Sequence, residues 1–176
     1  MAAKTPRKTG AGVPEADEHA VRQTLAPYEV APRPAANLFA GSYEADPRDK
    51  IAEIRRGVPA RRIGELSSLM DMSKESLMDF LGLSRATVNR KAQQDQPLSR
   101  GESERVLGVQ TLIGQVQAMV EGAGTSGFDA ARWVSRWLGE PLPALGGERP
   151  ADYMDTVEGQ KLVGRLLAMA GSGAYA

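Results

Sequence analysis

SKESLMDFLGLSRATVNRKA, residues 73–92, is the stretch that decides the fold. Its central LGLS segment places Gly82 where a first helix would end in a left-handed conformation, and Ser84 where a hydroxyl would cap a second helix. Four apolar residues have the spacing that lets two crossing helices share a buried seam: Leu77, Leu81, Leu83 and Val88. The stretch therefore predicts a helix-turn-helix, whose second helix lies in the major groove of DNA.

The expected recognition helix carries the polar residues Arg85, Thr87, Asn89, Arg90 and Lys91, whereas Ala86, Val88 and Ala92 are expected to face inward. Arginine pairs with guanine, asparagine pairs with adenine, and lysine and serine contact phosphates. The alternative is a solvated face, because glycine turns between helices are common. Met78 stands where this motif usually has alanine, which predicts a wider spacing of the two helices.

Two further helices are expected on the amino-terminal side of this pair. Asp46 and Pro47 form a helix start, Ile51, Ile54 and Val58 mark one face of that helix, and Gly57 marks its end. A second helix begins near Pro59 and would bury Ile63, Leu66 and Met70. Both would pack behind the helix-turn-helix.

A long helix is expected to follow, starting at a capping box formed by Ser99 and Glu102. Its apolar stripe is Val106, Val109, Ile113, Val116 and Val120, widened by Leu107, Leu112 and Met119. So broad a face favours self-association, with a purely internal core as the alternative.

The carboxy-terminal third is expected to be helical with one irregular interruption. Residues 122–127 are expected to be a flexible break, and residues 128–138 a helix that groups Val134, Trp137 and Leu138 with Trp133 beside them. Residues 139–147 contain too much proline and glycine for a helix, yet Leu142 and Leu145 are expected to be buried. Pro150 begins one helical turn, and Thr156 caps a last helix whose inner side is Val157, Leu162, Val163, Leu166 and Leu167. No strand alternation occurs, so the fold should be all-α.

Composition narrows the possible functions. The 176 residues, 41% of them hydrophobic, allow one compact unit plus a tail, and the absence of cysteine excludes disulfides and thiolate chemistry. The single histidine, His19, lies in the segment 1–45, which is rich in proline and alanine and is expected to be disordered, apart from contacts made by Asn37, Leu38 and Phe39. With no secretory signal and no apolar run of about 20 residues, we expect a cytoplasmic protein without membrane contact.

The formal net charge is zero, but its distribution is uneven. Residues 47–110 carry 12 basic and 9 acidic side chains, whereas residues 111–176 carry 5 and 7. The net positive charge of residues 47–110 is consistent with one face of this region contacting DNA phosphates. Two copies of the chain would be needed for useful affinity for DNA.

The chain from Ile51 onward resembles a known family. The segments that carry the resemblance are IRRGVPA from Ile54, FLGLSRATVNRK from Phe80, LSRGESERV from Leu98, WLG from Trp137, PALGGERP from Pro143, DTVEG from Asp155 and GAY from Gly173. They are similar to the Xre antitoxins of RES-Xre toxin-antitoxin systems, within the group named for MbcA, ParS and Xre. The ALGG-x-x-P stretch, followed by T-x-x-G before a last helix, is the most specific part.

The resemblance implies an Xre-like helix-turn-helix region over 46–121, which dimerises and binds operator DNA, and a small toxin-binding domain over 122–176. Carried over by residue, DNA contacts fall on Ser84, Arg85, Thr87, Asn89 and Arg90. Toxin contacts fall on Leu145, Gly146, Gly147, Pro150, Tyr153, Tyr175 and Ala176. The partner implied is a RES-domain toxin that degrades NAD, so no cofactor and no enzymatic activity are expected in this chain.

The carboxy-terminal residues alone leave alternatives open. Gly146 and Gly147 would allow close backbone approach to another surface, but they also fit an ordinary turn, and Tyr153 fits a core position. The free carboxylate of Ala176 could occupy a phosphate-binding site of the toxin, which a deletion of residues 173–176 would test. The competing functions are a stand-alone transcription regulator, a toxin-binding protein without DNA affinity and, least supported, an enzyme.

Overall fold

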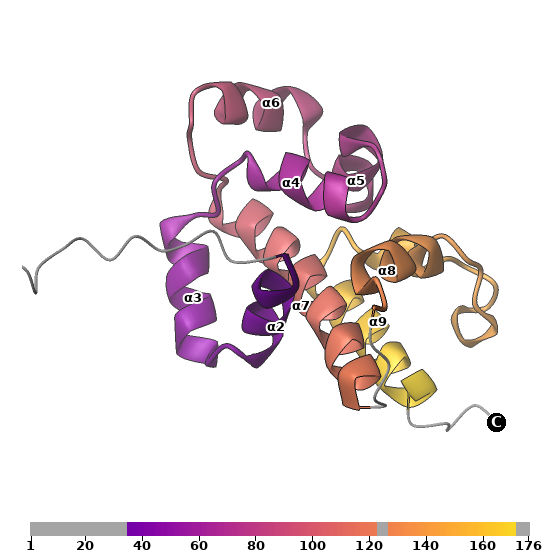
Figure 1. The fold of residues 1–176 in the computed structure, drawn as a ribbon. Helices are drawn as coiled ribbons and strands as arrows, with labels where there is room; N and C mark the ends of the chain where they lie inside the picture. The colour runs from indigo at the N-terminus through magenta and orange to yellow at the C-terminus, as the bar shows by residue number, and fades with distance from the viewer. Residues whose placement is uncertain (1–34, 123–126, 172–176) are drawn as a thin grey trace, which may run out of the picture. The chain divides into compact units, whose positions relative to one another are not determined.

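The computed structural model describes residues 35–122 and 127–171, and every described element is helical. The elements, labelled in Figure 1 where there is room, are α2 (Ala35–Glu44), α3 (Pro47–Arg56), α4 (Arg62–Leu69), α5 (Lys74–Phe80), α6 (Arg85–Gln93), α7 (Arg100–Gly122), α8 (Ala130–Leu138), η1 (Pro143–Leu145), η2 (Pro150–Tyr153) and α9 (Val157–Gly171). Over this part of the chain the only β-type pairing is one isolated bridge between Pro59 and Pro97. The all-α prediction is confirmed, and no described helix is long and apolar enough to cross a membrane.

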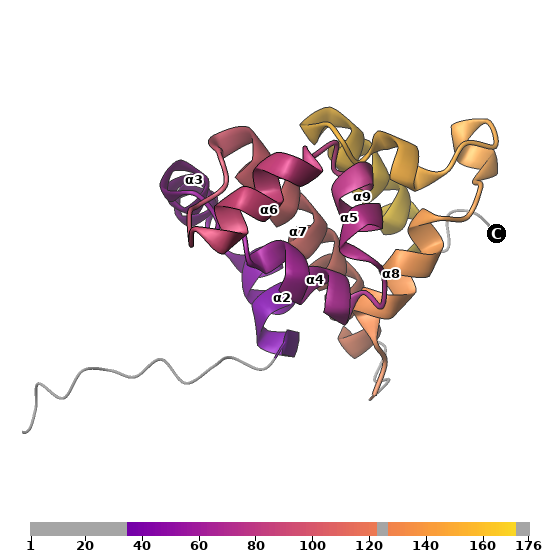
Figure 2. The same ribbon diagram turned by 90° about the horizontal axis from the view of Figure 1, so that it is seen from above.

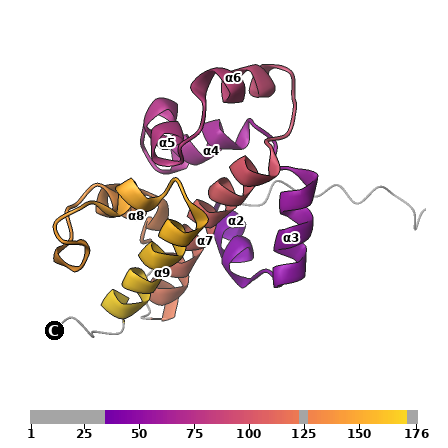
Figure 3. The ribbon, with the colours of Figure 1, turned by 180° about the vertical axis from the view of Figure 1, so that it is seen from behind.

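Helix α7 is the central element, and α2, α3, α8 and α9 pack around it (Figures 1 and 3). Val106, Val109, Ile113 and Val116 on its apolar stripe are at most 4% exposed, whereas Val120 is only partly buried. The broad face that favoured self-association is therefore covered by helices of the same chain. The internal core, which the sequence left as the alternative, is what the structure shows.

Helix α2 corrects the expectation of a disordered segment over 1–45. Phe39 is 4% exposed, and α2 approaches α7 so closely that a Cβ added to Gly114 would lie 2.2 Å from the Phe39 carbonyl oxygen. The contact that was expected from Phe39 is therefore made. The side chains of Asn37 and Leu38, and residues 1–34 with His19, lie outside the part that the structure describes.

Helices α3 and α4 form where the local signals predict them, but α3 buries less. Asp46 caps α3 by accepting a hydrogen bond from the Arg48 amide at 2.7 Å, and Gly57 ends the helix with φ 88°. On α4 the predicted residues Ile63 and Leu66 are buried, as is Met70 at its end. The expected apolar face of α3 is confirmed at Val58, which is 1% exposed just after the helix, and in part at Ile54, which packs against the core. It is wrong at Ile51, which is 46% exposed.

The carboxy-terminal part follows the expected order of elements. Asp129 caps α8 with a 3.0 Å bond from the Arg132 amide, and the Thr156 hydroxyl accepts from the Gly159 amide at 3.1 Å at the start of α9. Val163, Leu166 and Leu167 are buried as expected. Leu142 and Leu145 are only partly buried, against expectation, because η1 holds them in a loop at the edge of the bundle. The expected break at 122–127 includes residues 123–126, which are outside the described part.

Direct contacts join the helix-turn-helix to the carboxy-terminal elements. The Arg105 guanidinium donates to the Asp155 carbonyl oxygen at 3.2 Å, and the side-chain amide of Gln160 donates to the carbonyl oxygens of Arg105 and Met154 at 3.0 and 2.9 Å. Gly82 lies so close to Asp155 that an added Cβ would come within 3.0 Å of its Cβ. The helix-turn-helix region and the carboxy-terminal elements therefore pack into one continuous hydrophobic core.

Candidate functional site

The α5–α6 pair has the geometry of a helix-turn-helix. Gly82 adopts the left-handed conformation at φ 58°, and the Ser84 hydroxyl caps α6 by accepting from the Thr87 amide at 3.4 Å. All four residues of the predicted seam are buried: Leu77, Leu81, Leu83 and Val88. Met78, the unusual residue in this motif, is fully buried, so the core accommodates its larger side chain.

Arg85, at the first turn of α6, is held by an acidic residue of α5. Its Nε donates to one Asp79 carboxylate oxygen at 3.1 Å, and one of its NH groups donates to the other oxygen. These bonds raise the pKa of Arg85, so the guanidinium stays charged. A side-on pair of this kind occupies one edge of the guanidinium and leaves the end-on edge directed away from Asp79.

The other predicted DNA residues lie on the same helix with different exposures. Asn89 and Arg90 are exposed, Ser84 is an exposed cap, and Thr87 is partly buried. Figures 1 and 3 show α6 at the outer edge of the bundle, and Figure 2 views it from that side. Ala86 and Ala92, which were expected to face inward, are exposed, because only the side of α6 that carries Val88 meets the core.

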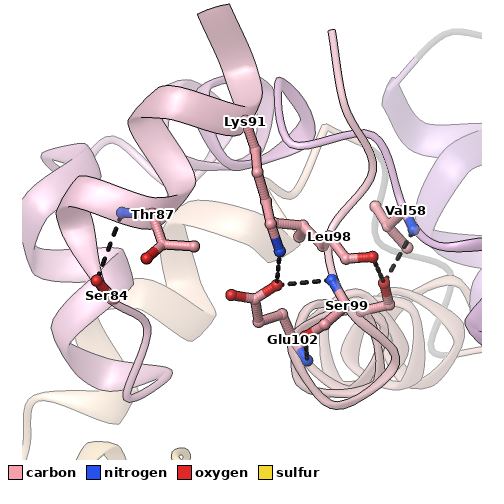
Figure 4. A network of polar contacts seen from close by, with 8 residues as sticks. Val58, Ser84, Thr87, Lys91, Leu98, Ser99 and Glu102 are labelled. Carbon is pink, nitrogen blue, oxygen red and sulfur yellow. Dashed lines mark hydrogen bonds and ion pairs between the residues drawn. The ribbon is translucent and has the colours of Figure 1, made fainter. Parts of the chain in front are cut away.

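Lys91 is bound within the protein. Its ammonium lies 2.5 Å from a carboxylate oxygen of Glu102, and the two side chains are only 16% and 13% exposed. The same oxygen accepts the Ser99 amide at 2.6 Å, while the Ser99 hydroxyl accepts the Glu102 amide at 3.4 Å, which confirms the capping box (Figure 4). The sequence assigned Lys91 to the polar, DNA-facing set, whereas here it fastens α6 to the start of α7.

Two opposing effects set the pKa of Glu102. Burial raises it, but the hydrogen bonds from Lys91 and Ser99 together outweigh burial and hold the pKa below its ordinary value. Nearby, the Ser103 hydroxyl accepts the Val58 amide at 2.9 Å and donates to the Leu98 carbonyl oxygen at 3.4 Å (Figure 4). These contacts anchor both ends of the helix-turn-helix region to α7.

The predicted toxin-binding residues differ in how exposed they are. Leu145 is partly buried, and Gly146 and Gly147 are exposed with φ 68° and 91°. Pro150 is buried at the start of η2, so its ring packs inside rather than facing a partner. Tyr153 is half-buried and donates to the Glu148 carboxylate, which raises the pKa of Tyr153. Tyr175 and Ala176 lie outside the described residues.

Beside this loop lies a groove that the sequence did not indicate. It has a volume of about 240 Å³ and is lined by Trp137, Leu142, Pro143, Ala144, Leu166 and Ala170. Trp137 stacks on Trp133 with ring centroids 5.9 Å apart, and Trp133 lies 6.3 Å from Phe128. The sequence placed both tryptophans on this helix, with Trp137 grouped with Val134 and Leu138, but it did not indicate a groove. The described residues hold no cluster of three metal-ligating side chains.

Comparisons with known proteins match both halves of the chain. Residues 49–110 match the antitoxin Xre-like helix-turn-helix domain, and residues 116–173 match the antitoxin Xre/MbcA/ParS C-terminal toxin-binding domain. A protein of Sphingobium sp. (strain YBL2), named Prs ADP-ribosylating antitoxin, is 49% identical over 135 residues, which cover 76% of this chain and 85% of that protein. The chain belongs to the Xre/MbcA/ParS family of antitoxins.

Proposed function

We propose that this antitoxin binds and neutralises an NAD-consuming RES-domain toxin and, as a dimer, binds operator DNA to repress its own operon. The observation that carries the proposal is the presence, in one chain, of a helix-turn-helix domain match over 49–110 and a toxin-binding domain match over 116–173. A protein with both surfaces is suited to report the amount of free toxin to its promoter.

The α6 surface supports the DNA-binding part. The end-on edge of Arg85 suits the two acceptors of a guanine, and Asn89, one helical turn later and exposed, suits an adenine. Arg90 and Ser84, which are exposed, suit phosphate oxygens. Helix-turn-helix proteins usually bind as dimers on half-sites one turn of DNA apart, and the proposed dimer rests on that geometry rather than on the α7 face.

The toxin-binding part is supported by the exposed loop and by the relative. Leu145, Gly146, Gly147 and Tyr153 remain proposed contacts, together with Tyr175 and Ala176. The name of the Sphingobium protein refers to ADP-ribosylation. ADP-ribosyl transfer takes ADP-ribose from NAD and releases nicotinamide, so hydrolysis of NAD and transfer from NAD both agree with an NAD-consuming partner.

The direct experiment pairs the antitoxin with the toxin encoded beside it. Co-expression with the neighbouring gene product, followed by measurement of cellular NAD and growth, should show NAD loss with toxin alone and none with both proteins. The antitoxin alone should consume no NAD, which separates the proposal from an enzymatic role. NAD loss that persists despite a stable complex would contradict neutralisation.

A stand-alone transcription regulator is the second candidate, because the same α5–α6 surface would serve it. That function predicts a shift of the promoter fragment by the pure protein and no complex with any neighbouring gene product. Recovery of a stoichiometric complex from co-expressing cells excludes it.

A further inference from the structure

The groove beside η1 lies between the η1 loop and the last turns of α9. Pro143 and Ala144 form one wall and directly precede the loop residues Leu145 and Gly146. Ala170 lies at the other end, in the last turn of α9 before the chain continues to residues 172–176. Figure 3 shows the η1 loop and α9 on the same side of α7, away from α6. The groove therefore adjoins the predicted loop contacts and reaches the last turn of α9.

The apolar surface continues from the groove along α8. Trp137 lines the groove, stacks on Trp133, and through it leads to Phe128, which is 39% exposed. Both tryptophans of the chain are in this row, although aromatic residues make up only 5% of the sequence. Partly exposed tryptophans are over-represented among the residues that carry most of the energy of protein interfaces, and contiguous apolar patches mark such interfaces.

The lining of the groove favours a protein side chain over a small molecule. Five of its six lining residues have aliphatic side chains, and the sixth, Trp137, adds one indole N–H, so no charged group, hydroxyl or amide is placed to orient a nucleotide or a cofactor. Its volume of about 240 Å³ is also below the roughly 300–1,000 Å³ of small-molecule sites. An apolar side chain needs only shape and the removal of water, both of which this groove supplies.

We propose that this groove, with the Trp137–Trp133 stack beside it, is the docking site of the toxin, and that an apolar side chain of the toxin fills it. The proposal rests on the proposed function and identifies the partner surface within it. The toxin is the occupant because all six lining residues fall within residues 116–173, the match to the toxin-binding domain, and because the groove is continuous with the proposed loop contacts.

A matched pair of substitutions on α9 tests the groove. Ala170 and Ala168 are both exposed residues in the last turns of the helix, but only Ala170 lines the groove. Ala170→Arg places a long charged side chain across the groove and should weaken binding to the tagged toxin at least tenfold. Ala168→Arg adds the same charge outside the groove and should leave the affinity within about twofold of wild type. Arginine suits the carboxy-terminal end of a helix, so neither change should unfold α9.

Ala144→Arg, on the opposite wall, provides a second route in case Ala170→Arg misfolds. Circular dichroism and operator binding should be unchanged in all three variants, because the groove is remote from α6. Wild-type toxin binding that persists in both groove variants overturns the docking site and leaves the proposed function intact. A wild-type chain that binds no toxin overturns the proposed function itself. A change of oligomeric state in the groove variants, without loss of toxin binding, would instead identify a second copy as the occupant.

Discussion

The α6 surface and the η1–α9 groove are opposites in chemistry. On α6, Arg85, Asn89 and Arg90 present charge and hydrogen-bonding groups, within a region of 12 basic and 9 acidic residues over 47–110. The groove presents apolar side chains within a region of 5 basic and 7 acidic residues over 111–176. A polyanion is attracted by the first surface and finds nothing to bind on the second. The two proposed activities should therefore be separable by single side chains, although one core holds both surfaces.

The strongest test of this separation removes the charges of α6. Arg85→Ala combined with Arg90→Ala should weaken operator binding at least about 30-fold, because a base-reading arginine contributes about 1–3 kcal/mol and a phosphate contact adds to it. Electrophoretic mobility shifts at two salt concentrations measure the loss and a smaller salt slope.

Toxin neutralisation by the same double variant should equal that of wild type. If the promoter fragment is still bound as tightly as by wild type, the base-reading assignment of α6 is wrong. If neutralisation fails as well, the two surfaces are not independent.

The second test loosens the attachment of α6 to α7. Glu102→Gln should lower the free energy of unfolding by about 2 kcal/mol, because Lys91 then remains largely buried without its charged partner. Denaturant titration with circular dichroism measures this. Glu158→Gln, which removes an exposed partner of Lys161, is the control and should change stability little.

The pH dependence of this difference has a defined sign. Because the pKa of Glu102 is held below its ordinary value of 4.5, its ionisation stabilises the folded state above that pH. The stabilisation is lost as the pH falls through the lowered pKa, so the gap between wild type and Glu102→Gln should shrink on acidification from pH 7. A gap that stays constant would show that the carboxylate charge does not matter.

A third test concerns the residue that orients Arg85. Asp79→Asn should reduce the preference for the operator over a fragment that lacks the contacted guanine. The expected reduction is about tenfold, or ~1.4 kcal/mol, because Arg85 is no longer held in one orientation. Total DNA affinity should rise slightly, since a negative charge near phosphates is removed. Asp95→Asn, which removes an acidic partner of Arg61 rather than of Arg85, is the matched control. Unchanged discrimination in the Asp79 variant would refute the orienting role.

The smallest effect is expected from the helix caps, one in each half. Ser84→Ala should cost about 1 kcal/mol of stability and weaken operator binding, whereas Asp129→Ala should cost a similar amount and weaken toxin binding. Thermal unfolding measures the first quantity, and the two binding assays measure the second. If Asp129→Ala weakened operator binding, or Ser84→Ala weakened toxin binding, the two surfaces would not be independent.

Sequence reasoning succeeded where the signal is local. The caps at Asp46, Ser84, Ser99 and Thr156 each involve residues within three positions of one another, so spacing alone identifies them. Lys91 and Glu102 are separated by the connection between α6 and α7, and local spacing does not predict how that connection folds. The sequence therefore grouped Lys91 with the polar residues of the recognition helix.

Long-range packing accounts for the remaining differences. The groove is lined by residues as far apart in the sequence as Trp137 and Ala170, so no local periodicity could reveal it. Helix α2 was hidden by a composition rich in proline and alanine, because its stability comes from burying Phe39 against α7 rather than from its own pattern. Ile51 shows the converse, since a correct apolar period does not guarantee that a partner covers it.

The contacts between α7 and the start of α9 limit how domains of such antitoxins can be exchanged. The amide of Gln160 binds the backbone of α7 at Arg105, and Arg105 binds Asp155, so α7 and the beginning of α9 are fitted to each other. A chimera that exchanges toxin specificity by joining two family members after Gly122 would separate these partners. Transplanting α8 and the η1 loop alone, between Asp129 and Arg149, would keep them together and is the exchange that this architecture tolerates best.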